Sequence, residues 1–174
     1  MPITFMNQVH PDDAERVASN GTDVTVEELE NLARLPKLRA LNLNTTNTTD
    51  AMLEIVGRLT GLEDLDLSLT DVTDAGMPRL RGLRKLRHLR IKETALTDRG
   101  IAMLRQHPDL ETLNLKHLAI GDAALGHLER LARLQQVVFA DLRASADALD
   151  RLQCALPDCE LIVDGRVLPR PSRD

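Results

Sequence analysis

Aromatic side chains are nearly absent from this sequence of 174 residues, which contains two phenylalanines and neither tyrosine nor tryptophan. Single-stranded nucleic acids and sugars commonly stack on exposed aromatic rings, so binding of that kind is not expected. The formal net charge of −5 points the same way, because a protein that grips a phosphate backbone is normally basic. These two features predict that the chain has no nucleic-acid partner.

Long apolar runs are also missing, since no segment approaches the roughly 20 residues that a helix needs to cross a bilayer. The opening segment MPITFMNQVHPDDAERV lacks the basic start and apolar stretch of a secretory signal. Two cysteines, Cys154 and Cys159, are too few for a disulfide framework. We therefore expect a cytoplasmic protein without a membrane partner. The excess of 18 arginines over 4 lysines favours a GC-rich bacterial genome.

The sequence does contain an internal repeat, which is marked by 32 leucines and by one recurring eight-residue segment. Copies of this segment begin at positions 22, 46, 70, 94, 118 and 142, so that successive copies are 24 residues apart without insertion or deletion. The best preserved copies are TNTTDAML, TDVTDAGM and TALTDRGI. A fixed period of this length is typical of a solenoid, in which stacked units share one core.

The first half of each unit alternates apolar and polar residues, as in LEDLDLS at 62–68. Because alternate residues of a strand face the same side, these segments predict strands with one buried face. Two inward-facing apolar residues recur in each unit: Leu41 and Leu43, Leu65 and Leu67, Leu89 and Ile91, Leu113 and Leu115, Val137 and Phe139, and Leu161 and Val163.

The second half of each unit has apolar residues every three to four positions, which is the spacing of one stripe of a helix. A residue suited to the helix N-cap precedes each of these halves, at Thr25, Thr49, Thr73, Thr97, Gly121 and Ser145. An aspartate follows four of these caps, at Asp50, Asp74, Asp98 and Asp122, where a negative charge suits the helix dipole. We also expect the hydroxyls of Thr46, Thr70 and Thr94 to stack and to bond the backbone of neighbouring units.

The segment LEDLDLSLTDVTDAGMPRLRGL, from Leu62 to Leu83, resembles a leucine-rich repeat of the 24-residue bacterial and F-box-associated type. The resemblance covers residues 17–164 and implies an α/β fold, a right-handed solenoid of about six repeats with parallel strands on the concave side and helices on the convex side. It also implies binding of a partner protein through the concave strand face.

The two ends fall outside this pattern. Residues 1–16 are expected to form an N-terminal cap, residues 10–18 a short helix that covers the first leucines, and residues 165–174 a frayed C-terminal tail. No room is expected for an F-box before Val17 or for a ligase domain after Val163. Cys159 falls at a position equivalent to the core and is interpreted as a small buried apolar residue.

Alternation assigns the residues between the inward-facing ones to the concave face, which runs from amides to acidic, basic and finally apolar side chains. Neighbouring strands lie about 4.8 Å apart, so Asp66 should lie beside Arg90. Arg90 is the strongest single candidate, because arginine is enriched where binding energy concentrates. The predicted partner-binding set is Asp64, Asp66, Ser68, His88, Arg90, Lys92, Thr112, Asn114 and Lys116.

These observations predict a non-catalytic protein-interaction module that acts as an adaptor or an assembly subunit. One alternative is an immunity protein that blocks a cognate bacterial toxin by complementary charge. A second alternative is a hydrolase in which Asp64 and Asp66 form an acid–base pair, although no aromatic platform accompanies them. The five histidines show no metal-ligand spacing, and neither a cofactor nor a small-molecule substrate is expected.

Overall fold

The computed structural model describes residues 2–5, 8–19 and 21–169 of the chain. Its main sheet has eight strands, which follow one another in space in the order of the sequence. Seven of them are parallel: β3 (Arg16–Ala18), β4 (Ala40–Asn42), β5 (Asp64–Asp66), β6 (His88–Arg90), β7 (Thr112–Asn114), β8 (Gln136–Phe139) and β9 (Glu160–Val163). Residue 65 pairs with residues 41 and 89, so the strand register repeats every 24 residues.

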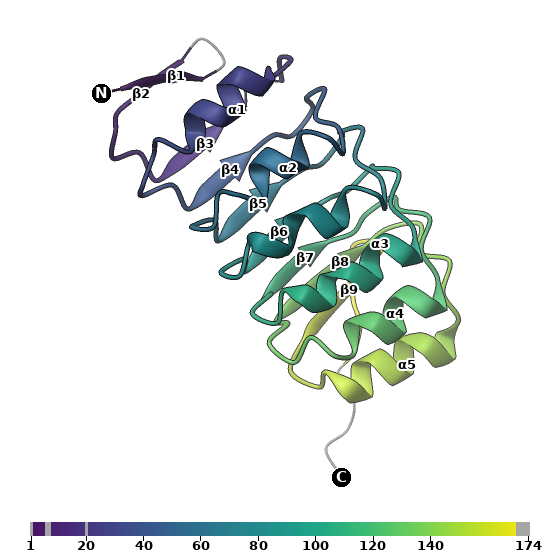
Figure 1. Ribbon diagram of the computed structural model, residues 1–174. Helices are drawn as coiled ribbons and strands as arrows, with labels where there is room; N and C mark the ends of the chain where they lie inside the picture. Colours follow the sequence, from purple (N-terminus) through teal and green to yellow (C-terminus); the bar gives the residue numbers. More distant parts are fainter. Residues whose placement is uncertain (1, 6–7, 20, 170–174) are drawn as a thin grey trace.

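Helices connect the strands and cover one face of this sheet, while the other face carries none of the described helices (Figure 1). In chain order they are α1 (Val26–Leu32), α2 (Leu53–Val56), the 3-10 helix η1 (Met77–Gly82), α3 (Asp98–Ala102), the 3-10 helix η2 (Met103–Gln106), α4 (Asp122–Leu128) and α5 (Ala146–Ala155). The structure thus has the predicted α/β solenoid architecture, with one strand and one helical segment in each repeat.

The core lies between the sheet and the helices, and it is built from the predicted inward-facing positions. Leu65 and Leu67 are fully buried, as are Val137 and Phe139 two repeats later. A single strand and a single short helix bury too little apolar surface to be stable alone, so each repeat depends on its neighbours. The continuous leucine core therefore holds the whole array together.

The predicted helix starts are confirmed in four repeats. Thr25 caps α1 in a capping box with Glu28, whereas Thr97 and Ser145 cap α3 and α5 with their hydroxyls. Gly121 holds the cap position of α4 without a side-chain bond. Thr49 and Thr73 are not N-caps, because α2 begins later, at Leu53, and the third repeat has only the 3-10 helix η1.

Pro78 explains the 3-10 geometry of η1. A proline has no N–H, so it cannot make the bond from residue 78 to residue 74 that an α-helix beginning at Asp74 would need. The amide of Arg79 donates instead to the carbonyl of Gly76, three residues earlier, at 2.9 Å. The repeats also approach closely here, since a Cβ on Gly82 would lie 2.3 Å from the carbonyl oxygen of Gly57.

The aspartates of the recurring segment have a role that the sequence pattern did not predict. The carboxylate of Asp74 accepts two hydrogen bonds from Thr97 of the next repeat, from the amide at 2.8 Å and from the hydroxyl at 2.6 Å. Asp50 contacts Thr73 in the same way, and Asp122 contacts Ser145. The motif therefore joins successive repeats through these bonds.

The glycine of the motif leaves room for these carboxylates. A Cβ on Gly76 would lie 2.3 Å from Oδ1 of Asp50, and a Cβ on Gly100 would lie 2.4 Å from Oδ1 of Asp74. No side chain fits at that distance without a shift of its neighbours. The sequence TDAG is thus explained by contacts between repeats as well as by helix capping.

The predicted threonine ladder between repeats does not form. Thr46, Thr70 and Thr94 donate within their own repeats, to the carbonyls of Leu43, Leu67 and Ile91, at 2.6–2.9 Å. Each bond closes a turn that contains a non-glycine residue with positive φ, at positions 45, 69 and 93. Because this turn spans only three residues, the hydroxyl reaches its own strand before it can reach a neighbouring one.

Both ends differ from the expectation. Residues 10–18 form no helix: the chain instead makes an antiparallel hairpin of β1 (Ile3–Phe5) and β2 (Gln8–His10), which packs on α1, and then the edge strand β3. At the other end, β10 (Arg166–Val167) pairs antiparallel with β9, so this part of the tail extends the sheet. Residues 170–174 of the predicted tail lie outside the described residues.

Candidate partner-binding face

The surface of interest is the open side of the sheet, here called the concave face. It is formed by the outward side chains of β3–β9 and by the next outward residue after each strand. Arg90 lies beside Asp66, as predicted, with Nε 2.9 Å from Oδ2 of that carboxylate. Its Nη2 also donates to Oδ1 of Asp64 at 2.7 Å, and Arg16 approaches the other oxygen of Asp64 at 3.6 Å.

This network changes the interpretation of Arg90. Two of its nitrogens are committed to carboxylates of the neighbouring strand, and the side chain of Asp66 is only 9% exposed. Breaking such a pair would leave a buried carboxylate without its partner, which is destabilising. Arg90 therefore organises the concave face as well as being part of it.

Ser68 is a member of the predicted set that does not face solvent. Its exposed fraction is 0%, and its hydroxyl has no hydrogen-bond partner among the described residues. Its amide donates to Oδ1 of Asp66 at 2.9 Å. Alternation alone placed Ser68 outward, but a small residue between larger neighbours is covered by them. We therefore leave it out of the contact surface.

The remaining predicted residues lie together on β6, β7 and the turns that follow. Nδ1 of His88 is 2.8 Å from the hydroxyl of Thr112 on the next strand. Lys92 and Lys116 follow β6 and β7, and the backbone after them stays paired, with the amide of Glu93 3.1 Å from the carbonyl oxygen of Lys116. These side chains are partly exposed.

A shallow hollow lies at the N-terminal end of the concave face, and the sequence pattern did not predict it. It is lined by Arg16, Val17, Ala18, Ala40, Leu41, Asn42, Asp64 and Arg90. The hollow exists because Ala40 is small, whereas the larger Asp64 and His88 occupy the equivalent positions of the next two strands. The in-phase position of Arg16, 24 residues before Ala40, is the signal that could have predicted it.

Catalytic and metal-binding chemistry receives no support from this geometry. Asp64 and Asp66 both accept a hydrogen bond from Arg90, which is an arrangement for ion pairing. Within residues 2–5, 8–19 and 21–169, no three histidine, cysteine or acidic side chains gather in a way suited to a metal ion. In the same ranges, no helix has the length and apolarity that a membrane span requires.

The cysteines are free thiols in different environments. Cys154 is exposed, whereas Cys159 is buried, as its core-equivalent position predicted. Burial is the main cause that raises the pKa of Cys159 to about 11, so this thiol stays protonated near neutral pH.

Comparison with known proteins identifies the fold through solved structures alone. No protein-family model matches the chain, and no curated protein sequence matches it. Among solved structures, an internalin (inlF) from Listeria monocytogenes matches with a TM-score of 0.63 and 19% identity, over 78% of this chain and 37% of that one. Internalin C2 (inlC2) of the same organism also matches with a TM-score of 0.63, at 21% identity, over 84% of this chain and 69% of that one.

Internalins are leucine-rich-repeat proteins, and the likeness covers most of this chain. The fold is therefore a leucine-rich-repeat solenoid of α/β class, as the repeat pattern indicated. The chain spans little more than a third of the first of these neighbours, and at these identities the likeness concerns the fold alone.

Proposed function

We propose that this chain is a non-catalytic module that binds a partner protein through the concave face. The observation that carries the proposal is the open sheet: seven parallel strands in register present outward side chains that none of the described helices covers. Proteins commonly use exposed, pre-formed surfaces for recognition, and their backbone then moves little on binding. A module of this kind acts by occupying its partner, as an adaptor or an assembly subunit.

We further propose that the protein works in the cytoplasm. Support comes from the two free thiols, one of which is exposed, because exposed free cysteines suit a reducing compartment. The inhibitor role, with a bacterial toxin as target, remains the alternative, and the identity of the bound partner separates it from the adaptor role.

A steric block on the face tests the proposal. Val138 lies in β8 between Asn114 and Ile162 of the adjacent strands and points outward. Val138→Trp adds bulk on the face, beside Asn114 of β7, without a change of charge. Ala123, which is exposed on α4, provides the control Ala123→Trp on the helical side.

The measurement is affinity capture from lysate of the source cells, with the captured protein identified and its stoichiometry determined. We expect one stoichiometric partner with the wild type and with Ala123→Trp, and its loss with Val138→Trp. Equal capture by Val138→Trp would place the binding site elsewhere, whereas loss with Ala123→Trp alone would place it on the helices. Circular dichroism spectra of both variants verify that they are folded.

A further inference from the structure

Over β3–β7 the concave face is asymmetric in its hydrogen-bonding groups: the side-chain acceptors of Asp64, Asp66, Asn42 and Asn114 are bonded within the protein, whereas several donors have no full partner among the described residues. The acidic groups of the N-terminal half illustrate this. Asp64 holds Arg90 and Arg16, and Asp66 accepts from Arg90 and from the amide of Ser68. These two carboxylates and two guanidinium groups also balance in charge.

The amide side chains on the face follow the same rule. Oδ1 of Asn42 accepts from the amide of Asn44 at 2.8 Å, and Oδ1 of Asn44 accepts from the hydroxyl of Thr45 at 2.8 Å. Oδ1 of Asn114 accepts from the amide of Lys116 at 3.3 Å. Each carbonyl oxygen thus accepts from the protein's own backbone or hydroxyls, whereas the NH2 groups of Asn42 and Asn114 have no hydrogen-bond partner among the described residues.

The donors without full partners lie on β3–β7. Lys92 has only a distant neighbour, Glu93, at 4.0 Å, and Lys116 has no ion-pair partner among the described residues. Arg16 is 77% exposed and only loosely held by Asp64. Two acidic side chains, Glu160 and Asp164, have one oxygen without a partner among the described residues, and they lie on β9 and just after it, at the other end of the sheet.

We infer that the concave face over β3–β7 binds an acidic segment of its partner protein, with one carboxylate on Arg16 in the hollow and further carboxylates on Lys92 and Lys116. This inference rests on the proposed function and names the partner's chemistry. The exposed guanidinium of Arg16 can bind a carboxylate in bidentate fashion, and the NH2 group of Asn42 adds a third donor at the hollow.

The dimensions fit an extended peptide that crosses the strands. From β3 to β7 there are four strand spacings, or about 19 Å at about 4.8 Å each. An extended chain advances about 3.3–3.6 Å per residue, so about six residues span the distance. A peptide of this length places its first and last acidic side chains over the hollow and over Lys116.

The test uses three end-capped peptides, hexaglutamate, hexaglutamine and hexalysine, titrated into the isotopically labelled full chain and followed by amide chemical shifts in NMR spectra. We expect hexaglutamate to shift the amides of Asn42, Lys92 and Lys116, more weakly at high salt because mobile ions screen exposed charges. The other two peptides should leave these amides unchanged.

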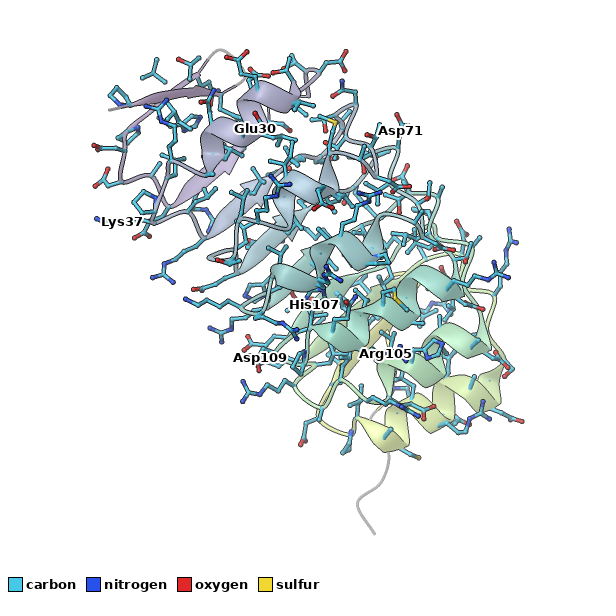
Figure 2. All side chains as sticks on the ribbon, viewed as in Figure 1. Glu30, Lys37, Asp71, Arg105, His107 and Asp109 are labelled. Carbon is cyan, nitrogen blue, oxygen red and sulfur yellow. The ribbon has the colours of Figure 1, made fainter. Side chains whose placement is uncertain are left out.

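The other two lysines of the chain provide a matched control. Lys37 lies at the edge of the solenoid opposite to Asp71 (Figure 2), and Lys85 lines a separate edge hollow with Glu63 and Asp109. Lys92→Gln/Lys116→Gln should weaken hexaglutamate binding about tenfold, in line with the loss of two exposed ion pairs. Lys37→Gln/Lys85→Gln makes the same change in net charge and should leave the affinity within about twofold of wild type.

Three results would overturn the inference: equal weakening by both double variants, tighter binding of hexalysine on the same amides, or no shift of these amides with hexaglutamate. The proposed function fails separately, in the capture experiment. A partner that is lost with Val138→Trp but fully retained by Lys92→Gln/Lys116→Gln would leave the concave docking face in place and exclude its acidic ligand.

Discussion

One pair of neighbouring repeats has only one of the two hydrogen bonds that the motif aspartate accepts elsewhere. Restoring the second bond tests directly whether these bonds between repeats stabilise the protein. Asp98 accepts from the amide of Gly121 at 2.8 Å, but glycine has no hydroxyl to donate to the second oxygen. In the next repeat Asp122 binds both groups of Ser145, at 2.6 and 2.8 Å. We predict that Gly121→Ser completes the contact and stabilises the protein.

The magnitude follows from three contributions. A serine at an N-cap is worth a few tenths of a kcal/mol more than glycine. A hydrogen bond to a partly exposed carboxylate adds about 0.5–1.5 kcal/mol. Replacing glycine lowers the entropy of the unfolded chain by about 0.4–1 kcal/mol, and the φ of −139° is one that serine adopts without strain. The new Cβ would lie 3.3 Å from the carbonyl oxygen of Arg143, a tight contact that reduces the sum to about 1–2 kcal/mol.

Urea unfolding followed by far-ultraviolet circular dichroism measures the change, because the chain has no tryptophan for fluorescence. Each kcal/mol should raise the melting temperature by roughly 2–4 °C in a chain of this size. Gly126→Ser is the control, since that glycine lies on α4 with open space around its Cβ position, and it should gain only a few tenths of a kcal/mol.

A double-mutant cycle separates the new bond from the other contributions. If the bond to Asp98 forms, Gly121→Ser should stabilise the wild type more than it stabilises an Asp98→Ala background, by about 0.5–1.5 kcal/mol. An equal gain in both backgrounds, or a gain no larger than that of Gly126→Ser, would refute the contact between repeats as the source of stability.

Two further perturbations follow from the same structure. Asp74→Ala removes both bonds to Thr97 and should lower the free energy of unfolding by about 2 kcal/mol, whereas Asp71→Ala, at an exposed site, should change it by less than about 0.5 kcal/mol in the same urea titration. His107 is buried with Nδ1 3.0 Å from the carbonyl oxygen of Leu83, and burial lowers its pKa, so stability should fall as pH drops below about 6.5, where the unfolded histidine takes up a proton. His107→Leu, which restores the residue that most repeats carry here, should make the free energy of unfolding less dependent on pH between about pH 7.5 and pH 5.5; an unchanged slope would contradict this.

Much of the candidate site followed from the period of two within each strand. Alternation placed Asp66 and Arg90 on one face, and the 24-residue repeat placed them on adjacent strands, which the structure confirms. The same rule failed at Ser68, which is buried. Alternation predicts which way a side chain points, but it does not predict whether larger neighbouring side chains cover it. The hollow beside Arg16 was missed for the related reason that it arises from a missing side chain, at Ala40.

The sequence by itself determined the solenoid, because identical spacing of inward leucines leaves stacking as the way to bury them. It also determined where most helices begin, since capping is a contact between residues two or three apart in the chain. Only the tertiary structure decided the partners of Asp50, Asp74 and Asp122, which lie 23 residues away. Such contacts depend on the distance between stacked repeats, and that distance is set by packing of the whole core.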